Sequence, residues 1–353
     1  MARRSVLRAL LLAPLVLAAC EHAPPGAVVA PTDVGPFLDA LPRRLTFSLN
    51  DDRTPSIGGD LVVYARQGDA YANPTYAPTG REECLAFLPV VGGTIQRLLC
   101  PHDLVPPTDT FVTTWFEPSL SPDGRRIAFT WQRGPNVGPL GFTSTYLMVT
   151  AVDRPADTTQ VRLVVDYNDG GLYPRRADFA SRVTWLGDGH LRFLATYEHI
   201  FKVKGGGADR VTDTIYTPLA LMDADLATGA VTRVPGGDSV IAYAAAPSGG
   251  VWVVREPDPS ALLLLDPATG TRTAVGRFSS AALDLVALDG APVAVVGPVA
   301  DPATSGLPVA VVRGGNLIER LDPATGQRSD LATFAGPFHH IAAAGSHRLV
   351  AEL

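Results

Sequence analysis

Cys20 is the first residue of this chain whose type and position indicate a specific chemistry. It directly follows the apolar run 9–19, and Arg3, Arg4 and Arg8 precede that run. A cationic stretch, a short apolar run and small residues before the cysteine are typical of a cleaved export signal, and the run is too short to span a bilayer. We therefore expect residues 1–19 to be removed, which leaves a reactive thiol at the start of the mature chain.

The other two cysteines, Cys84 and Cys100, flank a segment that indicates two strands joined at Gly92-Gly93. If Val91 pairs with Thr94 across that turn, Cys84 falls opposite residue 101, and a bulge of one residue would bring the two thiols together. In an oxidising compartment a disulfide is the expected state. Two buried free thiols are the alternative, and neither cysteine has a histidine or aspartate at a catalytic or metal-binding spacing.

Aromatic, histidine and arginine residues occur in the long segments between the predicted strands, and these are the candidate binding residues. Such side chains beside acidic ones recognise peptides or glycans. A solvated rim without a specific ligand is the alternative. The candidates are Tyr71, Tyr76, His102, Tyr167, Tyr173, Arg175, Arg176 and His199.

No catalytic or cofactor motif is found along the sequence. It has no G-x-S-x-G, no H-E-x-x-H, no phosphate-binding loop and no cysteine–histidine cluster. His339 and His340 are adjacent on an expected strand, so they point to opposite faces and do not readily share a metal. We predict neither a cofactor nor a metal, and no catalytic residue is assigned.

The segment Leu17-Ala18-Ala19-Cys20 resembles the lipobox of bacterial lipoproteins. The resemblance implies that Cys20 is acylated and that the lipid attaches the protein to a membrane of the cell envelope. Glu21 in the second mature position favours the outer membrane or its periplasmic side. Residues 20–42 are rich in proline and alanine, which predicts a flexible tether. The alternative is an ordinary secretory signal with a chance cysteine.

Charge and length limit the classes of partner. The predicted signal carries three of the 29 basic residues and none of the 35 acidic ones, so the mature net charge is −9. A chain this acidic gives no support for a nucleic-acid partner. The remaining residues, 43–353, are long enough for one large all-β domain, which we expect to be monomeric.

Two repeated turn-and-strand patterns predict the fold. The first places glycine, usually with aspartate or serine, before a short apolar strand, and the second is a hairpin whose turn is often D-x-A-T-G. The first pattern occurs at 57–65, 121–130, 186–195, 247–255, 288–296 and 343–351. The second occurs at 90–98, 225–234, 266–275 and 322–331, with a looser copy at 152–163. Two hairpins per unit give four strands, which is a propeller blade.

The segment SPDGRRIAFT at 121–130 resembles the WD40-like repeat of TolB-type six-bladed propellers, and the other copies match it only loosely. We expect an all-β propeller of about six four-stranded blades. The last repeat lacks a second hairpin, so residues 43–47 are expected to complete it and to close the ring between the two ends of the chain.

Long connections are expected on one face, at 66–83, 101–114, 132–145, 166–179 and 197–215. Loops on a rigid scaffold commonly carry binding sites. The favoured function is a non-enzymatic binding or scaffolding module for an envelope protein or a polymer such as a glycan. The alternative is a propeller enzyme of the polysaccharide lyase or hydrolase type, which would use histidine, arginine and tyrosine in a central funnel.

Overall fold

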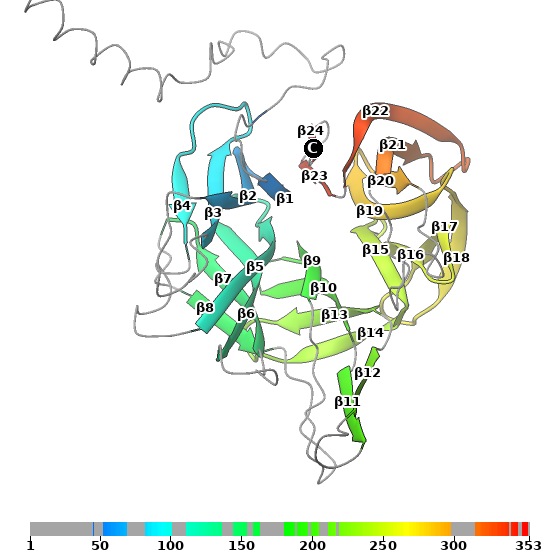
Figure 1. Cartoon of the computed structure of the whole chain (residues 1–353). Helices are drawn as coiled ribbons and strands as arrows, with labels where there is room; N and C mark the ends of the chain where they lie inside the picture. The colour runs from blue at the N-terminus through cyan, green and yellow to red at the C-terminus, as the bar shows by residue number, and fades with distance from the viewer. Residues whose placement is uncertain are drawn as a thin grey trace, which may run out of the picture.

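The structure, a computed structural model, consists of antiparallel β-sheets arranged as the blades of a propeller (Figure 1). It describes Leu45 and residues 52–68, 82–100, 111–135, 144–153, 158–162, 180–187, 189–196, 199–204, 211–216, 219–297, 315–338, 340–344 and 348–351. Within these residues there is no helix long and apolar enough to cross a membrane.

Five sheets have four strands each, and we number them as blades along the chain. Blade 1 contains β1 (Asp52–Gly58), β2 (Leu61–Gly68), β3 (Glu82–Pro89) and β4 (Arg97–Leu99). Blade 2 contains β5 (Phe111–Leu120), β6 (Arg126–Pro135), β7 (Ser144–Ala151) and β8 (Thr158–Arg162). Blade 3 contains β9 (Ala180–Trp185), β10 (His190–Thr196), β13 (Leu219–Asp225) and β14 (Val231–Asp238). Blade 4 contains β15 (Val240–Ala245), β16 (Val251–Arg255), β17 (Asp258–Leu265) and β18 (Arg272–Arg277). Blade 5 contains β19 (Ala281–Leu288), β20 (Ala291–Gly297), β21 (Gly315–Leu321) and β22 (Arg328–Phe338).

A two-stranded sheet, β23 (Ile341–Ala344) and β24 (Arg348–Ala351), fills the position between blade 5 and blade 1 (Figure 1). We call it the closing hairpin, because β23 contacts both β19 and β1. The prediction of six four-stranded blades is corrected here: the described residues form five such blades. The reason is that the last repeat supplies only two strands.

The strand expected from residues 43–47 lies outside the described residues, apart from Leu45. Leu45 packs against a cluster that includes Tyr64 of blade 1 together with Ala342 and Val350 of the closing hairpin. The expected closure between the two ends of the chain therefore stays a prediction, with one described residue at the place where it would occur.

The hydrophobic core is divided among the contacts between neighbouring blades. One apolar cluster lies at each such contact, including the two contacts that the closing hairpin makes. Because a blade is covered on both faces, the second strand of a blade can contain a run of buried residues that does not alternate. In β20 every residue is buried, whereas β14, an outer strand, has several exposed ones.

Tight turns join the first strand of each blade to the second, as the repeats predict. In blade 5 Leu288 pairs with Ala291, and the two turn residues, Asp289 and Gly290, have φ of 52° and 70°. A two-residue hairpin turn of this twist requires positive φ at both central positions, which explains the Asp-Gly pair. The D-x-A-T-G turns are also geometric: Asp266 accepts hydrogen bonds from Ala268 N (2.9 Å) and Thr269 Oγ1 (2.8 Å).

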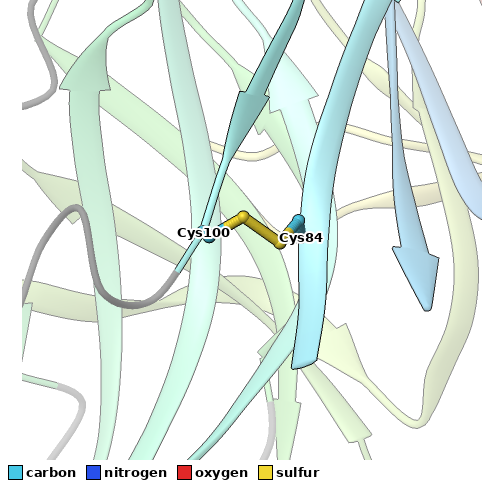
Figure 2. The surroundings of a disulfide bond; sticks show 2 residues. All are labelled: Cys84 and Cys100. Atoms are coloured by element: carbon cyan, nitrogen blue, oxygen red, sulfur yellow. A yellow bond between two sulfur atoms is a disulfide. The ribbon is translucent and has the colours of Figure 1, made fainter. Parts of the chain in front are cut away.

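A disulfide joins Cys84 and Cys100 across β3 and the end of β4 (Figure 2). The register differs by one residue from the expected one. Leu85 pairs with Leu99, which places Cys84 directly opposite Cys100, with 4.4 Å between their Cα atoms. No bulge is needed, because the chain turns over residues 90–96 and Val91 does not pair with Thr94.

The segment 197–215, expected to be a loop, contains a further hairpin. Its strands are β11 (His199–Lys204) and β12 (Val211–Tyr216), paired from His199 opposite Tyr216 to Lys204 opposite Val211. This hairpin, which we call the arm, is inserted between the second and third strands of blade 3 and extends away from the blades (Figure 1). The β-branched and aromatic residues that predominate in HIFKVK and VTDTIY favour strands over a loop.

Candidate functional site

Most of the candidate site residues lie in parts of the chain that the structure does not describe. Cys20 and seven of the candidate binding residues lie outside the described residues. The eighth, His199, is the first residue of β11 on the arm. The structure therefore does not test whether these residues converge, and the described chemistry is found elsewhere, at the axis of the propeller.

The innermost strands of all five blades and of the closing hairpin surround one cavity of about 400 Å³, which we call the axial cavity. Its wall contains residues of β1, β5, β9, β15, β19 and β23. Its volume lies within the range of small-molecule sites. The charged side chains of the wall are Glu117, Arg182 and Asp284, with His340 beside them.

A β-bulge in each of the first three inner strands places one polar residue at the axis. The ladders of β1, β5 and β9 shift register at Thr54, Glu117 and Arg182. These three residues have φ of 49°, 42° and 58°, which is rare for residues with a side chain. Bulges redirect side chains and are frequent next to functional sites. The repeated irregularity therefore explains why Glu117 and Arg182 reach the cavity.

Two hydrogen bonds near these bulges join the inner strands of neighbouring blades. Ser56 Oγ accepts from Leu120 N at 2.9 Å. Trp185 Nε1 donates to Ser119 O at 3.0 Å. Because inner strands are sheet edges, their backbone groups lack a ladder partner on the axial side, and side chains of neighbouring blades supply some of these partners.

Arg182 is the centre of this arrangement, which we call the axial network. Its guanidinium forms an ion pair with Asp284 of β19, and its Nη2 donates to Leu283 O at 2.8 Å. Its backbone N–H donates to Glu117 Oε2 of β5. One arginine thus connects blades 2, 3 and 5 across the axis.

Asp284 extends the network to the closing hairpin. Its Oδ2 accepts from Ile341 N at 2.9 Å, and His340 Nδ1 lies 3.7 Å from the same oxygen. Its Oδ1 accepts from Leu285 N at 2.8 Å. The carboxylate is buried, with 7% of its side chain exposed, so each of these contacts is made largely away from water.

Tyr243 connects blade 4 to the same network. Its hydroxyl lies 2.7 Å from the carbonyl oxygen of Arg192 and 3.0 Å from Thr184 Oγ1, and it donates to Arg182 O in one orientation. Every blade from 2 to 5 and the closing hairpin is therefore linked at the axis by polar contacts.

The protonation states follow from burial and charge together. Burial alone would raise the pKa of Asp284, but Arg182, His340 and the N–H of Ile341 outweigh it, and the pKa is lower than usual. Burial would lower the pKa of Arg182, but Asp284 and Glu117 raise it above its ordinary value. Burial raises the pKa of Tyr243, so its phenol stays neutral.

These states decide what the network can do chemically. Asp284 is an ionised hydrogen-bond acceptor, and Arg182 is a cation ion-paired with it. The pKa of Asp284 is shifted downward and that of Arg182 upward, both away from neutral pH. General acid–base catalysis requires a group whose pKa lies near the working pH. Among the residues that the structure describes, no group of three histidine, cysteine, aspartate or glutamate side chains could hold a metal ion.

Sequence reasoning missed the axial network, although a signal was present. The segments Thr54-Pro55-Ser56-Ile57 and Glu117-Pro118-Ser119-Leu120 precede the tight turns of blades 1 and 2 in the same register. Their shared Pro-Ser pair marks the bulge. Because the first residue differs in type from blade to blade, the repeat does not show which charges meet at the axis.

No protein-family model matches the chain, and no curated protein matches it. A solved structure provisionally described as a gluconolactonase is 14% identical with a TM-score of 0.45, and the match covers 86% of this chain and 87% of that one. Oligogalacturonate lyase in complex with manganese is 11% identical with a TM-score of 0.42, covering 80% of this chain and 65% of the lyase. TolB from Acinetobacter baumannii is 14% identical with a TM-score of 0.42, covering 78% of this chain and 54% of TolB. The sheets and their contacts make this chain an all-β propeller, and these structures resemble it in fold alone.

Proposed function

We propose that this chain is a lipoprotein of the cell envelope whose propeller binds a protein or polymer partner without catalysing a reaction. The observation that carries the proposal is the difference between the two faces of the ring. The first-to-second strand connections are tight turns, whereas the strand ends that flank 69–81, 101–110, 136–143, 163–179 and 298–314 lie at the opposite face. Long connections on a rigid scaffold are the usual place for recognition.

The axial network supports a binding module over an enzyme. Asp284 and Arg182 neutralise each other, and the remaining hydrogen bonds of Asp284 go to backbone groups of β19 and the closing hairpin. Such contacts keep the ring rigid, which lowers the cost of ordering a binding surface. We place the partner-binding surface on the long-loop face and on the arm, and we place the lipid at Cys20.

Lysine chemistry gives a direct test of partner binding at the arm. The chain has two lysines, Lys202 and Lys204, and both lie on β11. If the mature amino terminus is acylated, these are the only primary amines, so an amine-reactive crosslinker applied to intact cells reports partners that contact the arm. The variant Lys202→Arg/Lys204→Arg keeps both charges and removes both amines, which makes it the matched control.

We expect a crosslinked protein with the wild type and none with the double arginine variant. A photoreactive residue at Tyr76 or Arg176 extends the search to the long loops. A reproducible protein adduct supports the proposal, and a co-purified glycan supports binding of a polymer and calls for an assay of lyase or hydrolase activity. If neither is captured from any of these positions, partner binding at this face is wrong.

The lipid anchor is tested separately. Wild-type protein grown with labelled palmitate should carry the label and fractionate with membranes. The variant Cys20→Ala should lose the label and leave the membrane fraction. A wild-type protein that is exported but never labelled would show an ordinary secretory signal instead.

A further inference from the structure

The axial cavity has features of a ligand site that a merely structural channel does not need. One part of its wall, from blades 1 to 3, carries the buried side chains of Ile57, Leu120 and Trp185. The part from blades 4 and 5 contains Tyr243, Leu285 and Val286 together with the small residues Ala245 and Ala287. The cavity between these walls has a volume of about 400 Å³.

The charges of the wall do not balance. Among the described residues that line the cavity, Glu117 and Asp284 supply two carboxylates and Arg182 supplies one guanidinium. Arg182 is ion-paired with Asp284, and the backbone N–H of Arg182 donates to Glu117 Oε2. Glu117 is also partly exposed, so the surrounding protein does not fully cover it. The carboxylate of Glu117 therefore provides the net charge that a ligand would meet.

The backbone at Glu117 is also held in an unfavourable conformation. Its φ of 42° lies in the left-handed region, and Pro118 follows it within the bulge. A residue with a side chain costs about 1–2 kcal/mol there. Such residues cluster at binding and catalytic sites, where the surrounding fold maintains them. At Glu117 the result of this conformation is a carboxylate aimed at the axis.

We propose that the axial cavity binds a small organic cation, with an ammonium or guanidinium group against Glu117 and its aliphatic part against the wall from blades 4 and 5. The volume, near the lower end for ligand sites, limits the ligand to a small molecule. The cation completes the charge balance of the wall, and the carbonyl oxygens of the inner strand edges add acceptors around it. This site is separate from the partner-binding face, so either can fail while the other holds.

The probes are agmatine and 4-guanidinobutyrate, measured by isothermal titration calorimetry with the folded mature chain. Both carry a guanidinium on a four-carbon or shorter chain, but the second ends in a carboxylate that Glu117 would repel. We expect agmatine to bind and 4-guanidinobutyrate to bind at least tenfold more weakly. Agmatine should also raise the thermal midpoint of the wild type, because a ligand that binds only the folded state stabilises it.

Two variants locate the site. Glu117→Gln keeps an acceptor for Arg182 N and removes the charge, so agmatine affinity should fall at least tenfold. Ala245→Phe starts from an exposed alanine in the wall and fills the cavity without touching the axial network, so binding should be lost. The control is Asp330→Asn on β22, an exposed acidic residue outside the cavity, which should bind as the wild type does.

The wild-type measurement decides the proposal even if a variant does not fold. The absence of agmatine binding would overturn the proposal. Wild-type affinity for agmatine in folded Glu117→Gln and in folded Ala245→Phe would overturn it as well, because the cation would then bind elsewhere. Binding of calcium in place of agmatine would replace the organic cation by a metal ion and would also refute the proposal.

Discussion

Asp284 serves three elements with one carboxylate. It pairs with Arg182 of β9, accepts from the backbone of its own strand, and accepts from Ile341 at the start of β23. Removing one partner of a buried ion pair destabilises the fold more than replacing both partners with apolar residues, because the remaining charge keeps its desolvation cost. The stability of the ring closure is therefore concentrated in this residue.

We predict that Asp284→Asn lowers the free energy of unfolding by about 3–5 kcal/mol at neutral pH, since Arg182 stays buried without its counter-charge. Chemical denaturation followed by tryptophan fluorescence measures the change. Asp258→Asn is the control. Asp258 pairs with Arg277 on the surface, where side chains are 45% and 63% exposed, and its loss should change stability little.

The acid limb of the stability curve provides a further prediction. The pKa of Asp284 is lower in the folded state than in the unfolded chain, where an aspartate titrates near pH 3.9. The unfolded state therefore takes up the proton first as the pH falls. The contribution of Asp284 is complete above about pH 5 and is lost as the pH falls through the folded pKa. Thermal midpoints between pH 3 and 7 should fall less steeply for Asp284→Asn, and parallel curves would contradict this.

At the scale of elements, neighbouring blades approach one another closely at glycines. Gly236 of β14 has φ of 69°, and a Cβ there would lie 2.5 Å from Gly270 O in the third-to-fourth strand turn of blade 4. Gly229, in the corresponding turn of blade 3, has φ of 71° but no atom within 4 Å of its Cβ position. The two positions therefore separate backbone strain from steric conflict.

We predict that Gly229→Ala costs about 1–2 kcal/mol, the strain of a left-handed alanine. Gly236→Ala should cost about 1–3 kcal/mol more, because blade 4 must also move away. Urea denaturation of both variants measures the difference. Equal costs would mean that the contact between β14 and blade 4 yields without strain.

The disulfide acts on a single blade. It closes a loop with a sequence separation of 16 residues, for which the chain-entropy model gives about 3 kcal/mol. We predict a loss of that size in the double variant Cys84→Ala/Cys100→Ala and in reduced wild type, measured by denaturation with and without dithiothreitol. The reductant should leave the double variant unchanged. A shift there would show that reduction acts on something else.

The sequence predicts strands and turns well because their causes are local. Glycine and Asp-Gly turns fix the hairpins at 121–130 and 288–296, and the pairing in β5–β6 and β19–β20 confirms them. The Cys84–Cys100 register was predicted to within one residue for the same reason. The arm was missed because the polar and glycine residues that follow β11 were given more weight than the β-branched and aromatic residues of its two strands.

The axial network could not be predicted, because its partners are remote in sequence. Glu117 and Arg182 are 65 residues apart, and Arg182 and Leu283 are 101 residues apart. Their meeting depends on how the blades pack around the axis, which no local pattern encodes. The same limit applies to the blade count: six turn-and-strand copies are present, but the last provides only the closing hairpin.

At the scale of the whole molecule, the closing hairpin is the smallest sheet and joins the two ends of the ring. β23 lies between β19 and β1, with Ile341 packed against blade 5 and Ala342 against blade 1. A ring with one weak segment opens there first, because every other blade has four strands and two apolar contacts. The hairpin therefore sets the cooperativity of unfolding.

We predict that Val350→Asp in β24 lowers the free energy of unfolding by about 2–3 kcal/mol, because Val350 packs against the cluster that contains Ile57 and Tyr64. Deleting residues 349–353 should do more and lower the thermal midpoint further, since β23 then loses its partner strand. Leu331→Asp is the matched control: Leu331 is 44% exposed on the outer strand β22, so the same new charge should cost less than about 0.5 kcal/mol. Differential scanning calorimetry measures all three proteins. If the deletion leaves one cooperative transition at the wild-type midpoint, the ring does not close through β23 and β24, and the contacts of Asp284 with Ile341 contribute nothing to its stability.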